Sequence, residues 1–189
     1  MEDNFVTISR LNASITYPCN FMFVASMNPC PCGYYGLAEK KCSCRPDQIK
    51  KYINRISGPL LDRIDIHIEV TPIKYEKLNN TEKTESSEDI RKRVNNARQK
   101  QIERYKEYNI FSNSELMPSM TEKFCELNSL SKKLLKNAFQ KLNISTRAYG
   151  KILKVARTIA DLDNSEYILE NHIAEAIQYR TLDRKYWKY

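Results

Sequence analysis

Residues 21–33 read FMFVASMNPCPCG and pass from an apolar run into a turn-forming segment. Residues 21–25 are apolar on both faces, which is typical of a central strand in a parallel sheet that helices cover. Pro29 and Pro31 end this run, because proline cannot donate to a strand ladder. A second strand is predicted at residues 64–70, where isoleucine and valine alternate with polar side chains. The two segments indicate an α/β core with a partial parallel sheet.

The segments on either side extend this α/β pattern. Residues 5–10 and 15–25 are rich in β-branched and aromatic side chains, and the short stretch between them predicts a β-hairpin. Downstream, residues 46–57 carry apolar side chains at helical spacing. The polar residues 75–87 then mark the best candidate for a domain boundary.

The C-terminal half is predicted to be entirely helical. One helix starts after Ser86, which has a capping-box-like partner three residues on. Ser131 and Ser145 are expected to cap two more helices, and a last helix covers about residues 169–179. The predicted domains are residues 1–74 (partial α/β core with the hairpin and a four-cysteine loop), 75–120 (linker and connecting helix) and 121–189 (helical domain).

Glycine is scarce in this chain of 189 residues, and its spacing excludes two common nucleotide-binding motifs. The four glycines are Gly33, Gly36, Gly58 and Gly150. A phosphate-binding loop needs two glycines five positions apart, and a dinucleotide-binding turn needs three in the pattern G-x-G-x-x-G. Neither pattern occurs, so the sequence contains no phosphate-cradling loop.

The net charge of +8 favours polyanionic partners only mildly. Most of the excess lies in the C-terminal part and is interleaved with acidic residues, so a solvated surface and a nucleic-acid patch both remain open. The N-terminus lacks the pattern of a secretory signal, and the uncharged residues 11–38 contain no apolar run of about 20 residues. A cytoplasmic location without membrane contact is therefore expected.

Four of the six cysteines, Cys30, Cys32, Cys42 and Cys44, form two closely spaced pairs. Thiols stay reduced in the cytoplasm, which favours metal ligation over disulfides. Four thiolates around zinc make a closed tetrahedral site, and such a site is structural because no coordination position is left for water. The sequence predicts a structural zinc site, with reduced loop thiols or a redox role as alternatives.

Three further side chains stand where water or anions are often bound. Asn28 follows the apolar segment, at the end where open parallel sheets bind ligands. Arg63 lies between a helix end and a strand start, and its guanidinium suits phosphate. Arg147 falls in the first turn of the helix after Ser145, where the helix dipole favours anions. Each has an ordinary alternative: a turn for Asn28, a structural ion pair for Arg63 and a solvated surface position for Arg147.

Four blocks of this sequence resemble a known family in the family's own order. They read EDNFVTISR, SITYPCNFMFVASMNPCPCGYYG, RISGPLLDRIDIHIEV and STRAYGKILKVARTIADL, the last continued by HIAEAIQYRTLDR. They closely resemble the C-terminal portion of magnesium-chelatase-like AAA+ ATPases of the ComM/YifB type, over nearly the whole chain. The resemblance implies a truncated AAA+ P-loop NTPase core, followed by a helical C-terminal lid at residues 121–189.

The resemblance also implies roles for the three side chains. Asn28 matches the sensor-1 asparagine, which positions the attacking water. Arg63 matches the arginine finger, which acts in trans on a nucleotide held by a neighbouring subunit, and Arg147 matches the sensor-2 arginine, which reports the γ-phosphate to the lid. The hairpin at residues 5–20 is similar to the pre-sensor-1 insertion, which points toward the central channel in related ring motors.

Members of this family couple ATP hydrolysis in a hexameric ring to work on DNA. They carry a Walker A loop, a Walker B segment and a Lon-like domain ahead of the portion that this sequence resembles, and none of these is found here. The leading hypothesis is therefore the sensor and lid half of such an ATPase, which binds ATP and Mg²⁺ only with a complementary half. The alternatives are a stand-alone zinc-containing nucleic-acid-binding or adaptor module, and a non-functional remnant.

Overall fold

A computed structural model describes residues 5–11, 13–37, 40–73, 84–142 and 144–180 of the chain. These residues fall into two compact units, Met1–Arg63 and Ile64–Tyr189. Most of the polar stretch that marks the predicted domain boundary, residues 74–83, lies outside the described ranges.

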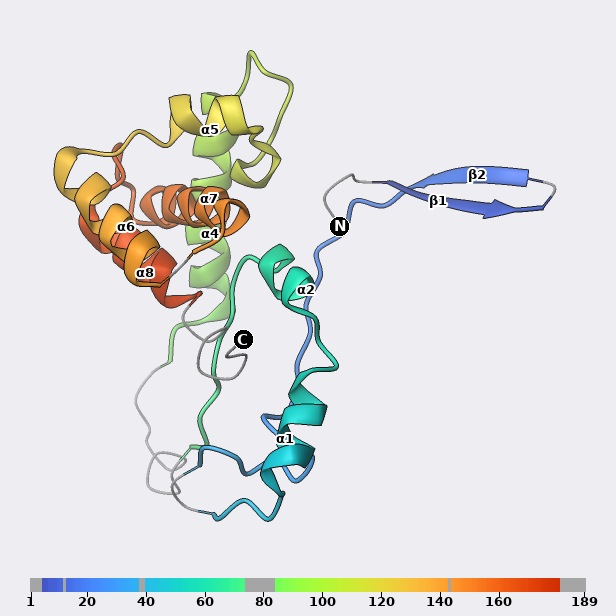
Figure 1. The fold of residues 1–189 in the computed structure, drawn as a ribbon. Coiled ribbons are helices and arrows are strands. Elements are labelled where there is room, and N and C mark those ends of the chain that lie inside the picture. The colour runs from blue at the N-terminus through green and yellow to red at the C-terminus, as the bar shows by residue number, and fades with distance from the viewer. Residues whose placement is uncertain (1–4, 12, 38–39, 74–83, 143, 181–189) are drawn as a thin grey trace. The chain divides into compact units, whose positions relative to one another are not determined.

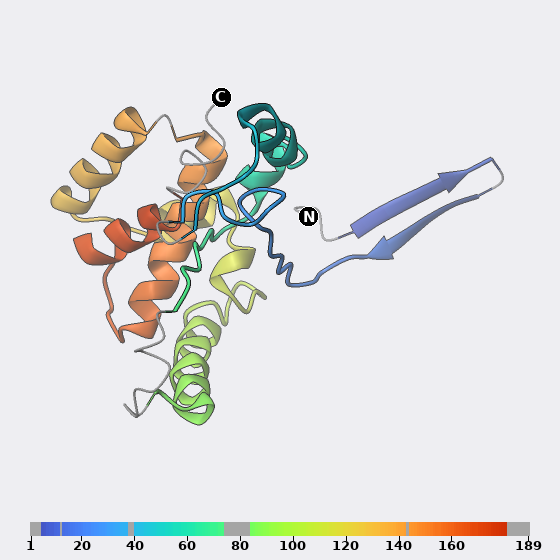
Figure 2. The same cartoon turned by 90° about the horizontal axis from the view of Figure 1, so that it is seen from below.

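The first unit begins with the β-hairpin that the sequence predicts. β1 (Phe5–Arg10) pairs antiparallel with β2 (Ala13–Pro18), and Figure 2 shows the two strands as a long ribbon. Alternation along the strands places the threonine and serine hydroxyl groups on one face and the β-branched apolar side chains Val6, Ile8 and Ile15 on the other. On the hydroxyl face, Thr7 Oγ1 and Thr16 Oγ1 lie 2.9 Å apart. Every side chain of both strands is exposed.

The predicted partial parallel sheet does not form among the described residues. β2 ends at Pro18 rather than continuing to residue 25, and residues 21–25 and 64–70 have no strand pairing. A strand is held by hydrogen bonds to a neighbouring strand, and the described chain offers only β1 and β2. The fold is therefore mixed α/β with one two-stranded sheet. Apart from the half-buried Ile64, the large apolar side chains of both unpaired segments are exposed: Phe21, Met22, Phe23, Val24, Ile66, Ile68 and Val70.

Two short helices complete the first unit. α1 (Pro46–Ile53) begins at a proline, which is favoured in the first helical turn, and the Arg45 N–H donates to the Gln48 side chain at 3.0 Å. This helix is four residues shorter than predicted. α2 (Gly58–Arg63) follows it and was not predicted.

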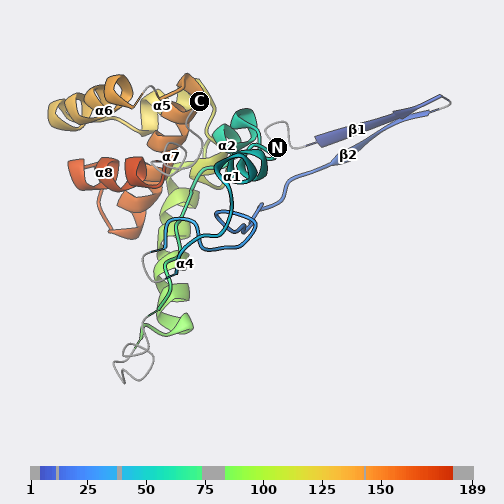
Figure 3. The same ribbon diagram turned by 60° about the horizontal axis from the view of Figure 1, so that its bottom comes forward.

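The second unit is built from helices around α7. Four elements pack against this helix, and α8 also packs against α6 (Figure 1). Figure 3 shows α4 extending past the other helices, and residues 87–96 at its start are exposed. No helix in the described ranges is both long and apolar enough to cross a bilayer. The elements are α4 (Ser87–Arg104), the 3₁₀ turn η1 (Asn113–Glu115), α5 (Pro118–Phe124), α6 (Ser129–Lys141), α7 (Thr146–Leu162) and α8 (Glu170–Gln178).

Side-chain caps fix where these helices begin. Ser86 and Ser145 each accept the backbone N–H three residues on, at 3.2 and 3.1 Å, as the sequence predicts. The predicted cap of α6, Ser131, is wrong by three residues. Asn128 is its N-cap and accepts the Ser131 N–H at 2.7 Å, because an asparagine amide oxygen caps a helix as well as a serine hydroxyl does.

A buried ionic network joins α4, η1 and α7. Asp161 on α7 is 2% exposed, and its carboxylate accepts a hydrogen bond from Arg104 on α4 and one of 2.9 Å from the Asn113 amide. Arg157 lies 3.2 Å from the same carboxylate. Burial opposes the charge of Arg104, but the bonds to Asp161 raise its pKa overall. One carboxylate therefore pairs with two guanidinium groups.

Replacing Asp161 with alanine should destabilise the second unit strongly. The buried guanidinium of Arg157 and the half-buried one of Arg104 would lose their carboxylate, and breaking a buried pair in this way costs about 3–5 kcal/mol. The matched control is Glu88→Ala, which removes an exposed partner of Lys92 on α4 and should cost about 0–1 kcal/mol. Urea unfolding followed by circular dichroism measures both, and equal small losses would contradict the structural role of Asp161.

Candidate metal centre

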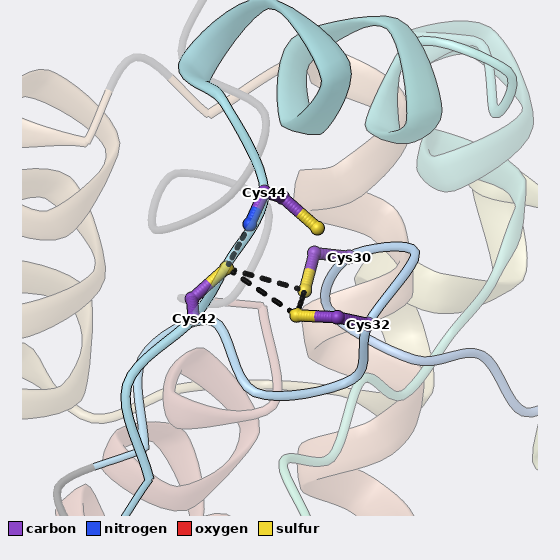
Figure 4. Close-up of side chains that lie close together, drawn as sticks. All are labelled: Cys30, Cys32, Cys42 and Cys44. Carbon is purple, nitrogen blue, oxygen red and sulfur yellow. Dashed lines mark hydrogen bonds between the residues drawn. The ribbon is translucent and has the colours of Figure 1, made fainter.

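Four cysteine thiols meet in the loop before α1, residues 30–44, here termed the cysteine loop. Cys30 Sγ lies 3.3 Å from Cys32 Sγ and 3.7 Å from Cys42 Sγ, and the latter two sulfur atoms are 3.5 Å apart. With Cys44, all four sulfur atoms lie within 4.8 Å of one another. Figure 4 shows the four side chains around a common centre. The structure thus brings together all four predicted ligands.

Backbone turns bring the two cysteine pairs together. Gly33 has a φ of +83°, a left-handed conformation in which a side chain would be strained. Its N–H donates to the Cys30 carbonyl at 3.0 Å and closes the first pair into a turn. In the second pair, the Cys44 N–H donates to Cys42 Sγ at 3.4 Å. The N-cap of α1, Arg45, follows directly, so the cysteine loop also sets where α1 begins.

The thiols differ in how readily they ionise. Donation from the Tyr34 N–H is the main cause that lowers the pKa of Cys32 to about 5. The Cys44 N–H lowers the pKa of Cys42 in the same way, but burial and three neighbouring thiols together raise it to about 12. Burial also raises the pKa of Cys44. One thiolate therefore forms easily in this cluster, whereas further thiolates need a cation beside them.

This donor set fits zinc. Zn–S bonds of about 2.3 Å in a tetrahedron place neighbouring sulfur atoms about 3.8 Å apart, close to the separations in the cysteine loop. A disulfide needs an S–S bond of about 2.05 Å, and all four cysteines are free thiols. Because four thiolates leave no coordination position for water, a zinc ion bound here would hold the loop and would not activate a substrate.

Asn28 and Arg63 belong to the first unit. Asn28 is exposed beside the cysteine loop, and its Cγ lies 3.9 Å from the position that a Cβ on Gly33 would take. Arg63 is the last residue of α2, and its Nη1 donates to the Pro59 carbonyl at 2.9 Å. This bond holds the half-exposed guanidinium along its own helix.

Arg147 belongs to the second unit. It is exposed in the first turn of α7, directly after the Ser145 cap, as the sequence predicts. The dipole at this end of a 17-residue helix adds to its positive charge. A shared nucleotide site for Arg147 and the two side chains of the first unit remains a prediction.

Two family models match this chain in succession. Residues 1–78 match the family described as magnesium chelatase, subunit ChlI, and residues 84–180 match magnesium chelatase, subunit ChlI C-terminal. The chain belongs to the magnesium chelatase family. In this magnesium chelatase family member, the cysteine loop falls within the first match, and the helices from α4 to α8 fall within the second.

Individual relatives place the chain more narrowly within the magnesium chelatase family. It is similar to competence protein ComM of Haemophilus influenzae, with 42% identity over 185 residues. The uncharacterized protein YifB is 40% identical in Escherichia coli and 37% in Salmonella typhimurium. The chain is thus a magnesium-chelatase-like protein of the ComM/YifB type. These alignments cover 97% of the chain but 35% of each relative, so the chain spans about a third of their length.

Proposed function

We propose that this chain is the sensor and lid portion of an ATP-hydrolysing AAA+ ring motor of the ComM/YifB type that acts on DNA. The observation that carries the proposal is the succession of two family matches along one chain, at residues 1–78 and 84–180. Sequence identity of 40–42% over almost the whole chain supports assigning the roles of the family's motif residues to the matching residues of this chain, one by one.

Each of the three residues has the chemistry that its proposed role needs. The Asn28 amide both donates and accepts hydrogen bonds, so it can orient an attacking water. The Arg63 guanidinium is planar and permanently charged, which suits the charge that develops on a transferred γ-phosphoryl group. Arg147 sits at the start of a long helix, so a pull on its guanidinium by the γ-phosphate would be transmitted to α7 as a rigid element.

The proposal requires a phosphate-binding loop that these 189 residues do not contain. Residues 21–25 and 64–70 support a sheet interface with a segment that carries such a loop. Both have strand-like sequences, and both expose large apolar side chains such as Met22 and Val70, each 88% exposed. Exposed apolar segments of this kind mark interaction sites or aggregation hazards. Pairing with further strands would bury them and complete the core.

ATP hydrolysis is expected only when the chain is joined to, or co-purified with, a family segment that carries the phosphate-binding loop. Phosphate release is measured for the chain alone, for that segment alone and for the two together at equal concentration. A combination in which the lysine of the phosphate-binding loop is replaced serves as the control. Hydrolysis by the chain alone, or none by a combination that co-elutes in gel filtration, would contradict the proposal.

A second candidate function, a zinc-containing nucleic-acid-binding module, is favoured by one specific observation. The four thiols of the cysteine loop come together within residues 30–44 and need no ligand from elsewhere. Nucleic-acid binding by the chain alone, with steep salt dependence, would favour this candidate. The two functions are compatible, because a motor of this type also needs a surface that holds its substrate.

A further inference from the structure

A band of positive charge surrounds the cysteine loop and α1. Residues 40–55 contain six basic side chains and a single acidic one, Asp47. All six basic side chains are exposed. Four zinc-bound thiolates would contribute two negative charges in total, which leaves the segment positive. We name this set the basic band: Lys40, Lys41, Arg45, Lys50, Lys51 and Arg55.

The charges of the basic band are not neutralised by ion pairs within the described residues. The second unit differs: Lys92, Arg93 and Lys151 each meet a carboxylate at 2.5–2.9 Å. Within the basic band, Lys40 faces a ring instead of a carboxylate, since its Nζ lies 4.0 Å from the centroid of Tyr34. A dense set of exposed, unneutralised cations is the footprint of a polyanion site.

The structure holds this charge on a fixed framework next to aromatic rings. On α1, Lys51 lies opposite the inward side chains Ile49 and Ile53, because residues on a helix face repeat every three to four positions. Lys50 lies at the flank of that face and is exposed as well. The four-cysteine cluster fixes the loop that leads into this helix. Tyr34 is half-buried and the neighbouring Tyr35 is 39% exposed, so an aromatic surface lies beside the cations.

We propose that the basic band, with Tyr34 and Tyr35, is a binding surface for single-stranded nucleic acid. Lysine and arginine side chains contact successive phosphates, and the tyrosine rings stack on bases. Stacking of this kind tolerates any sequence and requires unpaired bases, which is why a single strand fits better than a duplex. This inference deepens the proposed function, because it assigns the binding of the substrate to a surface of this chain. The choice of DNA as the physiological polyanion rests on the proposed function.

The test is binding of a fluorescein-labelled oligo(dT) of about 20 nucleotides to the zinc-loaded chain, followed by anisotropy at several salt concentrations. The double variant Lys50→Ala/Lys51→Ala should weaken binding about tenfold and reduce the slope of log K against log salt by roughly 1.4. Tyr35→Ala should weaken binding with an unchanged slope, because stacking displaces no counterions. The matched control, Lys132→Ala/Lys133→Ala on α6, removes the same charge and should change binding less than about twofold.

Several outcomes would overturn the proposal. They are equal weakening by the two lysine pairs, an undiminished affinity in the Lys50/Lys51 variant, better competition by duplex DNA than by oligo(dT), and equal competition by polyglutamate. Zinc content and circular dichroism of each variant show that it has folded. The assay contains neither ATP nor a second protein segment, so failure of the proposed ATPase leaves its result unaffected.

Discussion

Replacing Arg63 with alanine is expected to lower ATP hydrolysis by the assembled protein about 10³–10⁵-fold and to leave nucleotide binding nearly unchanged. The guanidinium would stabilise charge that develops only as the γ-phosphoryl group is transferred, so its loss acts on the rate and not on the affinity. Lysine should not restore the rate, since a point charge does not reproduce the planar fork of arginine. Phosphate release and binding of a fluorescent ATP analogue are measured on the same preparations.

The position of Arg63 allows a test that separates catalysis in trans from a structural role. Its guanidinium donates to the Pro59 carbonyl in α2, so a purely structural account predicts loss of helix and of stability. If the residue acts on a neighbouring subunit's nucleotide, mixing Arg63→Ala subunits with subunits that lack a working phosphate-binding loop should recover part of the rate. In such mixed assemblies, some subunit interfaces combine the intact phosphate-binding loop of an Arg63→Ala subunit with the intact Arg63 of its neighbour. No recovery in mixed assemblies, with both variants folded, would rule out action in trans.

Local features of this chain could be predicted from the sequence because neighbouring residues determine them. β1 (Phe5–Arg10) has the predicted bounds, and Ser86 and Ser145 cap the predicted helices. The four cysteines were also predicted to meet, since two tight pairs joined by a short loop have few ways to separate. In these cases the partner groups lie within about a dozen residues, so spacing alone carries the information.

Features that depend on distant partners could not be predicted in this way. Residues 21–25 have the composition of a buried strand, but a strand also needs neighbours, and composition does not show whether they are present. On α4, the apolar stripe includes Ile90 and Val94, yet both are more than 40% exposed, because the packing against α7 covers only the later turns. The burial of Asp161 depends on Arg104, 57 positions away.

Metal analysis of the chain, purified under reducing conditions, is expected to give about one zinc ion per molecule. The double variant Cys42→Ser/Cys44→Ser should retain less than about a tenth of that amount, because two neutral hydroxyl groups replace two anionic ligands. Cys19→Ser is the matched control, since Cys19 lies outside the cluster, and it should keep its zinc. Substoichiometric zinc that does not change in the double variant would refute the metal site.

The pH dependence of zinc binding follows from the ionisation of these thiols. The pKa of Cys32 is lowered to about 5, so this thiol is already ionised at neutral pH. The pKa of Cys42 is raised to about 12 and that of Cys44 is raised as well, so zinc must displace both of their protons. The affinity should therefore rise with pH and fall at least about 100-fold from pH 7 to pH 6, tenfold for each of these two protons. Competition with a chromogenic chelator measures this dependence, and a flat profile would show that these two thiols are not ligands.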